Sequence, residues 1–158
     1  MNKSKSVLED DAMEQFELRD FFPYQVRVFY TEVTSAVAQI YQEQHDMSAA
    51  EWRCLAILNG GEEMTAADIV IASSMDKVTV SRALSKLGTR DWVTLTHNRQ
   101  DGRSKLIQLS TSGKAILRDL MPKILEVEAR LLDGLSENQI RQFQETLAKI
   151  SVNRATLS

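Results

Sequence analysis

Polar and basic side chains recur on one side of residues 76–89, close enough in sequence to act on the same partner. They are Lys77, Thr79, Ser81, Arg82, Ser85 and Lys86. Val80, Leu84 and Leu87 recur at steps of three and four, which predicts an amphipathic helix that exposes this polar set. Arg can pair with guanine, while Ser, Thr and Lys can bond to bases or phosphates. The pattern predicts a helix face that binds double-stranded DNA; an ordinary solvated helix face is the alternative.

More basic residues follow in a predicted β-hairpin. Apolar and polar residues alternate in residues 93–97 and 105–109, and a polar turn containing Asp-Gly joins the two segments. Arg103 is the strongest candidate here, because the negative potential of a minor groove favours a guanidinium group. Arg99 and Lys105 are further candidates for phosphate contacts. The alternative is a plain surface turn whose ion pair contributes little energy.

Capped helices are predicted to position the polar face. Ser48 is followed three residues later by Glu51, and Thr65 is followed at the same spacing by Asp68, so each pair can form a capping box at a helix start. The helix that begins at Thr65 is short, and the helix of residues 76–89 comes directly after it. Two such helices form a helix-turn-helix, and a hairpin directly behind them forms a wing.

Long amphipathic helices flank this central region. Apolar residues at steps of three and four predict a helix over residues 23–45, and a second helix is predicted over residues 111–133. Ser136, with Gln139 three residues later, is expected to cap a last helix. Pro122 lies inside the second of these helices and is expected to kink it. The predicted fold is therefore mainly α with a small β-hairpin wing, a winged helix-turn-helix between long terminal helices.

Charge is distributed unevenly along the 158 residues. The whole chain carries a net charge of −3, but residues 65–110 contain seven Lys or Arg and four Asp, so this segment is basic and the remainder is acidic. Local phosphate binding requires only a local basic surface. Residues 1–20 hold three basic and six acidic residues and no apolar signal segment, and we expect them to form a flexible acidic arm.

Two stretches resemble the MarR family of bacterial transcription regulators. Residues 64–87, MTAADIVIASSMDKVTVSRALSKL, resemble that family's helix-turn-helix, and residues 101–113, DGRSKLIQLSTSG, resemble its wing and the start of the next helix. The flanking helices also fit in order and length. Asp91 stands where the family usually has Gly, Leu95 stands near a common Arg, and Ser110 replaces the usual Thr. The departures at Asp91 and Leu95 bear on the path of the first wing strand, whereas Ser110 can cap the next helix as well as Thr.

The resemblance implies a homodimer. Residues 21–47 and 111–158 would supply the dimerisation helices, and residues 48–110 the DNA-binding lobe. The two recognition helices would enter successive major grooves of a pseudo-palindromic operator, with half-sites about 10 bp apart. For many members the resemblance also implies a repressor that is released from DNA by a small aromatic or anionic ligand, bound in a crevice between the dimer region and the DNA-binding lobe.

Candidates for such an effector site combine aromatic and basic groups. They are Phe22, Tyr24, Arg27, Trp52 and Arg53. Similar segments occur in MarR-type regulators of aromatic-acid catabolism, and an Arg beside aromatic surface suits a carboxylate or the phosphates of an acyl-coenzyme A. The alternative is that Arg27 and Arg53 form ion pairs between subunits or lobes.

Other kinds of chemistry lack support in the sequence. The single cysteine, Cys54, lies among core positions, where a buried structural thiol is more common than a redox sensor. His45 and His97 have no nearby ligand cluster, so no metal site, cofactor or catalytic group is predicted. No apolar run approaches the roughly 18 residues that span a membrane, and we expect a cytoplasmic protein. A winged-helix module that binds protein without ligand control is the alternative function.

Overall fold

The computed structural model describes residues 16–98, 102 and 104–157. Its elements are η1 (Leu18–Asp20), α2 (Phe22–His45), α3 (Ala49–Leu58), β1 (Met64–Thr65), α4 (Ala66–Ser73), α5 (Lys77–Thr89), β2 (Val93–His97), β3 (Lys105–Leu109), α6 (Thr111–Leu131) and α7 (Glu137–Ala155). The strands form one antiparallel sheet in the order β1-β3-β2. The predicted fold class, mainly α with a small hairpin, is confirmed. Within the described ranges, no helix has the length and apolar character needed to cross a membrane.

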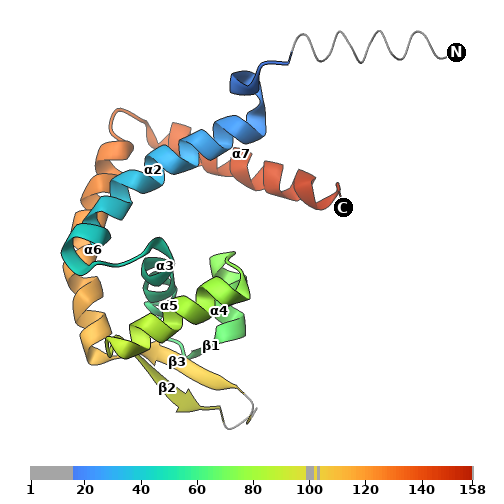
Figure 1. The fold of residues 1–158 in the computed structure, drawn as a ribbon. Helices are drawn as coiled ribbons and strands as arrows, with labels where there is room; N and C mark the ends of the chain where they lie inside the picture. Colours follow the sequence, from blue (N-terminus) through green and yellow to red (C-terminus); the bar gives the residue numbers. More distant parts are fainter. Residues whose placement is uncertain (1–15, 99–101, 103, 158) are drawn as a thin grey trace, which may run out of the picture.

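The elements divide into a lobe and a surrounding frame (Figure 1). Helices α3, α4 and α5 and the sheet form the lobe, with the β2–β3 hairpin at the end away from α7. Helices α2 and α6 curve around the lobe, and α2 leads away from it towards α7. This arrangement leaves one face of α5 and the hairpin uncovered by the frame.

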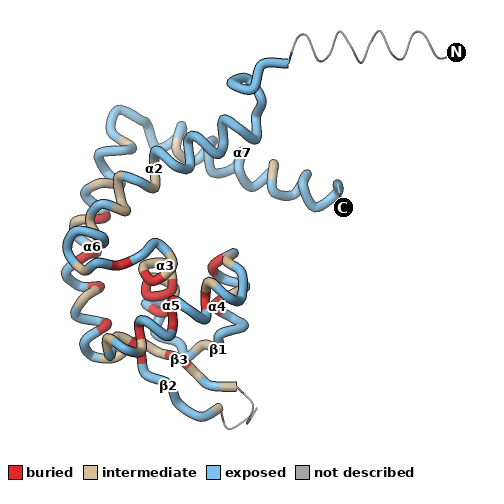
Figure 2. The backbone as a smooth tube through the Cα atoms, viewed as in Figure 1, coloured by how far each residue is buried: buried red, intermediate tan, exposed pale blue. Residues whose placement is uncertain are grey.

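Burial is concentrated in the lobe and in the part of α6 beside it (Figure 2). The buried apolar core is formed by Tyr41, Met47, Cys54, Leu55, Leu58, Ile69, Val80, Ala83, Leu84, Leu87, Val93, Ile107, Leu109, Leu117, Leu120 and Ile124. Tyr41 is the one buried residue of the 24 in α2, and α7 has no buried residue. The lobe and the adjoining side of α6 therefore share one core, whereas among the described residues α7 and nearly all of α2 remain outside it.

The predicted capping boxes are present at three helix starts. At α3, the Ser48 backbone N–H donates to Glu51 Oε2 at 2.8 Å, and the Glu51 N–H donates to Ser48 Oγ at 3.3 Å. Thr65 with Asp68 and Ser136 with Gln139 form the same reciprocal pair at α4 and α7. Each cap contributes about 1 kcal/mol to helix stability, so local sequence fixes where these helices begin.

Two features differ from the sequence predictions. Strand β1 was not predicted, because two residues are too few to show alternation; it pairs with β3 through Met64 and Ile107. Residues Leu18–Asp20, inside the predicted arm, form a 3-10 turn, while residues 1–15 lie outside the described ranges. Pro122 lies inside α6, as predicted, and the helix runs on from Thr111 to Leu131; the kink stays a prediction.

The turn between α5 and β2 depends on Asp91, which stands where the resemblance places Gly. Its φ of 55° lies in the left-handed region, where a Cβ is unfavourable. The Asp91 carbonyl oxygen accepts hydrogen bonds from Ser110 Oγ at 2.5 Å and Ser112 Oγ at 2.9 Å. Asp91 therefore accepts the same two hydrogen bonds at its carbonyl oxygen that Gly would accept. Its left-handed backbone conformation, however, costs free energy.

Asp91→Gly is therefore expected to raise the free energy of unfolding by up to about 1 kcal/mol, because glycine adopts positive φ freely and keeps the same carbonyl acceptor. Urea denaturation followed by circular dichroism measures the change. Gly134→Ala is the matched opposite, since Gly134 has φ of 78° and no atom near its missing Cβ. Its free energy of unfolding should fall by about 1 kcal/mol. A lower free energy of unfolding in both variants would contradict the argument at Asp91.

Candidate DNA interface

Helix α5 begins at a strong N-cap. Asp76 Oδ1 accepts the backbone N–H groups of Val78 and Thr79, both at 2.9 Å, and Oδ2 accepts the Thr79 hydroxyl at 2.6 Å. The Thr79 hydroxyl and backbone bonds lower the pKa of the Asp76 carboxyl, so the cap is ionised at neutral pH. Val80, Leu84 and Leu87 are buried on the inner side of the helix. The cap and the buried stripe together fix which face of α5 points outward.

Four of the predicted DNA contacts lie on that outward face. Lys77, Ser81, Arg82 and Ser85 are exposed, and within the described ranges none of their side chains has a hydrogen bond or ion pair. A row of hydroxyl, ammonium and guanidinium donors is therefore available on one helix for an acceptor-rich partner. Base edges and phosphates both present such acceptors.

The other two predicted residues of α5 already have partners. The Thr79 hydroxyl bonds to Asp76, and Lys86 Nζ lies 3.5 Å from Glu51 Oε1. Glu51 is buried, and among the described residues this oxygen accepts no hydrogen bond. Lys86 therefore balances the charge of a buried carboxylate beneath α5. Without a cationic partner, burial of that carboxylate would cost free energy. Thr79 and Lys86 therefore help to hold α5 in place. Both also lie near its exposed face.

The hairpin stands beside the same face of α5. Strands β2 and β3 pair from Val93↔Leu109 to His97↔Lys105. A groove of about 960 Å³ runs between α4, α5 and the hairpin, with Leu95 and Ile107 on one wall and Lys77 and Lys105 among its lining residues. Lys105 is thus brought to the side of the α5 donors. The predicted contacts Arg99 and Arg103 lie outside the described residues.

The effector candidates do not converge within one chain. Trp52 stacks on Tyr41 of α2, with ring centroids 5.8 Å apart and planes 11° apart. Arg53 donates to the Tyr30 hydroxyl at 3.0 Å and to the Ser73 carbonyl at 3.3 Å, so it joins α2 to the end of α4. The Tyr30 bond joins frame and lobe, whereas the Ser73 bond joins α3 to α4 within the lobe. Among the described residues of one chain, neither Arg27 nor Arg53 forms an ion pair, and ion pairs between subunits stay a prediction.

The remaining effector candidates are exposed near the start of α2. Phe22 lies eight residues before Tyr30 in the helix, about 12 Å along its axis. Tyr24 is also near that end, whereas Arg27 is within one turn of Tyr30. The structure therefore separates Phe22 and Tyr24 from the Trp52–Arg53 end of the set. Tyr30 itself was not predicted as a partner of Arg53, although it belongs to the apolar stripe of α2.

Cys54 lies at the centre of the lobe. The side chain is fully buried, and burial raises the pKa of its thiol to about 11. The thiol is therefore protonated at neutral pH, and the reactive thiolate is scarce. Its position fits the structural thiol that the sequence favoured.

Known proteins share this architecture. The MarR family model matches residues 45–104, which run from the end of α2 through the hairpin turn. The chain is similar to MepR of S. aureus, solved in complex with DNA, at 26% identity over 84% of this chain and 96% of MepR, with a TM-score of 0.75. It is also similar to a MarR/EmrR family regulator from Acinetobacter sp. ADP1, at 20% identity over 90% of this chain and all of the other, with a TM-score of 0.79.

A third similar structure is BpsR of Bordetella bronchiseptica, whose DNA binding is regulated by 6-hydroxynicotinic acid. It is 20% identical over 86% of this chain and 96% of BpsR, with a TM-score of 0.77. Comparison with curated proteins finds no match. Residues 45–104, which carry the α5 donors and the first hairpin strand β2, match the MarR family, and the chain as a whole has the fold of MarR winged-helix transcription regulators.

Proposed function

We propose that this protein is a MarR-type transcription regulator that binds a pseudo-palindromic DNA operator as a homodimer. The observation that carries the proposal is the donor row of α5, Lys77, Ser81, Arg82 and Ser85, which has no partner among the described residues and lies beside the hairpin. A helix with such a row suits the major groove, and an adjacent hairpin suits the neighbouring backbone or minor groove. The local basic charge of residues 65–110 supports the same partner.

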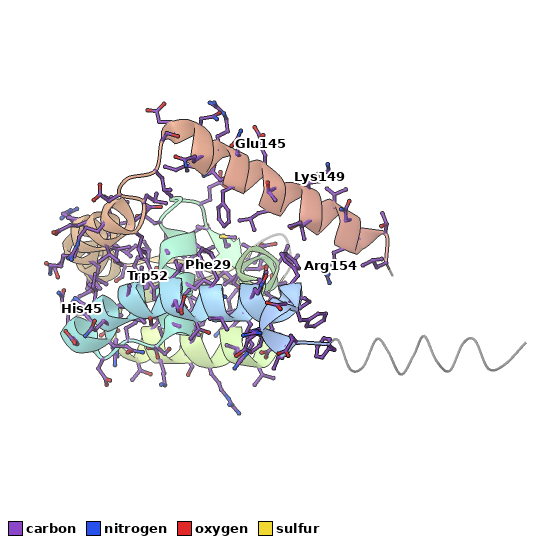
Figure 3. All side chains as sticks on the ribbon, turned by 90° about the horizontal axis from the view of Figure 1, so that it is seen from above. Phe29, His45, Trp52, Glu145, Lys149 and Arg154 are labelled. Carbon is purple, nitrogen blue, oxygen red and sulfur yellow. The ribbon has the colours of Figure 1, made fainter. Side chains whose placement is uncertain are left out.

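The frame supports the dimer. Apolar side chains on α2 and α7 remain exposed, including Val26, Phe29, Phe143 and Leu147, each between 42% and 50%. Phe29 and Phe143 contact each other edge to face at 5.8 Å, so the apolar surfaces of the two helices join there. Figure 3 shows Phe29 on α2. A second copy of the chain would cover this surface and hold two α5 helices at a fixed separation.

The same proposal includes repression that a small aromatic or anionic ligand relieves. PcaV of Streptomyces coelicolor, solved with its natural ligand, and BpsR, regulated by an aromatic acid, have the same fold. Arg53 and Trp52 lie where α2 meets the lobe, so a ligand bound beside them would bear on the relative position of frame and DNA-binding helix. A ligand acts only through different affinities for the two arrangements. Thermal-shift measurements with aromatic carboxylates and their coenzyme A esters test this part: an effector should raise Tm and release DNA.

Arg82→Ala is expected to weaken operator binding by roughly 5- to 150-fold and to relax base preference, because one guanidinium that reads a base is worth about 1–3 kcal/mol. The operator is first selected from random DNA by the wild-type protein. Gel shifts across a salt series then give affinity and salt dependence for both proteins. Arg118→Ala, which removes an exposed guanidinium from α6, is the matched control and should leave affinity within about twofold.

Two results would contradict the proposed function. One is a wild-type protein that selects no sequence and shows no steep salt dependence, which would leave the protein-binding module as the better interpretation. The other is an Arg82→Ala protein that binds as tightly as the Arg118→Ala control.

A further inference from the structure

Arg90 links the end of α5 to the end of α2. It is the C-cap residue of α5, and its Nη1 donates to the His45 carbonyl at 2.6 Å while its Nη2 donates to the Asp46 carbonyl at 3.0 Å. The same Nη2 lies 3.7 Å from Asp46 Oδ2. The last carbonyls of a helix have no partner within it, and a cation there is favourable. One side chain from the DNA-binding helix therefore caps the long frame helix.

Aromatic and charged groups hold the Arg90 guanidinium in place. Its Cζ lies 4.8 Å from the centre of the Trp92 ring, and Trp92 meets the His45 ring edge to face at 6.0 Å. His45 Nε2 lies 3.5 Å from Asp119 of α6. We call these five residues, His45, Asp46, Arg90, Trp92 and Asp119, the α2–α5 joint. His45 marks its position at the end of α2 (Figure 3).

The joint is the direct polar connection between α5 and the frame helix α2. Among the described residues, no other hydrogen bond or ion pair joins α5 or its C-cap to α2. Another polar link between frame and lobe, from Tyr30 through Arg53 to Ser73, reaches α4, and the Ser112 hydroxyl of α6 reaches the Asp91 carbonyl in the turn after α5. Movement of α2 relative to α5 must therefore strain or break the Arg90 bonds.

Small rotations at this joint have large effects at the DNA. Helix α5 has 13 residues, so it is about 20 Å long. A rotation of about 5° at its C-terminal end moves the other end by about 1.7 Å. Hydrogen bonds to base edges tolerate only a few tenths of an ångström. The angle at the joint therefore decides whether both recognition helices of a dimer can engage their half-sites together.

We propose that Arg90 is a positioning residue that fixes the spacing between the two half-sites that the protein accepts. The inference rests on the proposed function, because it requires a dimer that binds DNA through α5. Arg suits the task since its planar fork reaches two carbonyls at once, whereas Lys offers a single point charge. Arg90 itself is half-buried against Trp92 and is not needed as a DNA contact.

The test compares wild-type protein with Arg90→Met, which keeps the apolar stem against Trp92 but removes every donor. Operators selected by the wild-type protein are rebuilt with the half-site spacing changed by about 1 or 2 bp, each base pair adding about 3.4 Å and about 34° of rotation. Wild-type affinity should fall about tenfold or more at a 2 bp change, and Arg90→Met affinity by about threefold or less. Arg90→Lys should lie between them, and Arg118→Met should match the wild type.

The readout separates positioning from stability. If Arg90 only stabilises the fold, Arg90→Met lowers Tm and reduces binding to every operator by the same factor. The spacing profile, meaning affinity plotted against half-site spacing, then keeps its shape. That result would overturn the inference and leave the proposed function intact. A wild-type protein with no operator preference would overturn both. A flattened profile in Arg90→Met, with folded protein at the assay temperature, supports the positioning role.

Discussion

Gly113→Ala is expected to lower the free energy of unfolding by about 3 kcal/mol. A Cβ at Gly113 would overlap the carbonyl oxygen of Trp92. That carbonyl cannot move aside easily, because it accepts the Ser110 N–H at 3.1 Å while the Trp92 N–H donates to the Leu87 carbonyl at 2.9 Å. The first turn of α6 is thereby packed directly on the backbone that leads into the wing. Glycine is required at this position because there is no room for a Cβ. Its backbone conformation is that of an ordinary helix and makes no such demand.

Gly88→Ala is the matched control, because Gly88 also lies in a helix next to the wing. Its added Cβ would meet only Leu95 Cδ1, at 4.0 Å. This variant should gain about 0.5–1 kcal/mol from the higher helix propensity of alanine. Urea denaturation of the two variants and the wild type gives both changes. Equal stability of Gly113→Ala and wild type would show that the Trp92 backbone relaxes at little cost.

Local signals in the sequence predicted most of the elements and their starts. Ser48 with Glu51 marks the start of α3, and Ser136 with Gln139 marks the start of α7, because a capping box involves groups only three residues apart. Helical periodicity likewise identified the buried stripe of α5. The exposed donors of α5 followed from the same pattern, since residues opposite a buried stripe must face outward.

Contacts between distant segments could not be predicted in this way. Arg53 meets Tyr30 across 23 positions, and Arg90 meets His45 across 45. Which carbonyl or hydroxyl a long basic side chain reaches depends on the packing of two helices, and sequence periodicity contains no such information. The partner of Lys86 was missed for the same reason, because Glu51 was already accounted for as a helix cap.

Phe143→Glu is expected to convert the protein from dimer to monomer and to weaken operator binding by about 100-fold or more. Phe143 is 48% exposed on α7 and contacts Phe29 of α2, so the new carboxylate would lie within the apolar surface that a second copy is proposed to cover. Burying an unpaired charge costs several kcal/mol. Loss of the second half-site removes the gain in avidity that a linked pair of contacts provides.

Light scattering after size-exclusion chromatography gives the mass of the variant, and gel shifts give its affinity. The lobe core contains no residue of α7, so the helical circular dichroism of the lobe should survive the substitution. Gln144→Glu introduces the same charge one position along the helix, on a different side, and should remain dimeric. A dimeric Phe143→Glu protein would mean that another surface joins the two copies. In that case the separation of the two α5 helices, and with it the spacing that Arg90 is proposed to fix, would be set by a different frame.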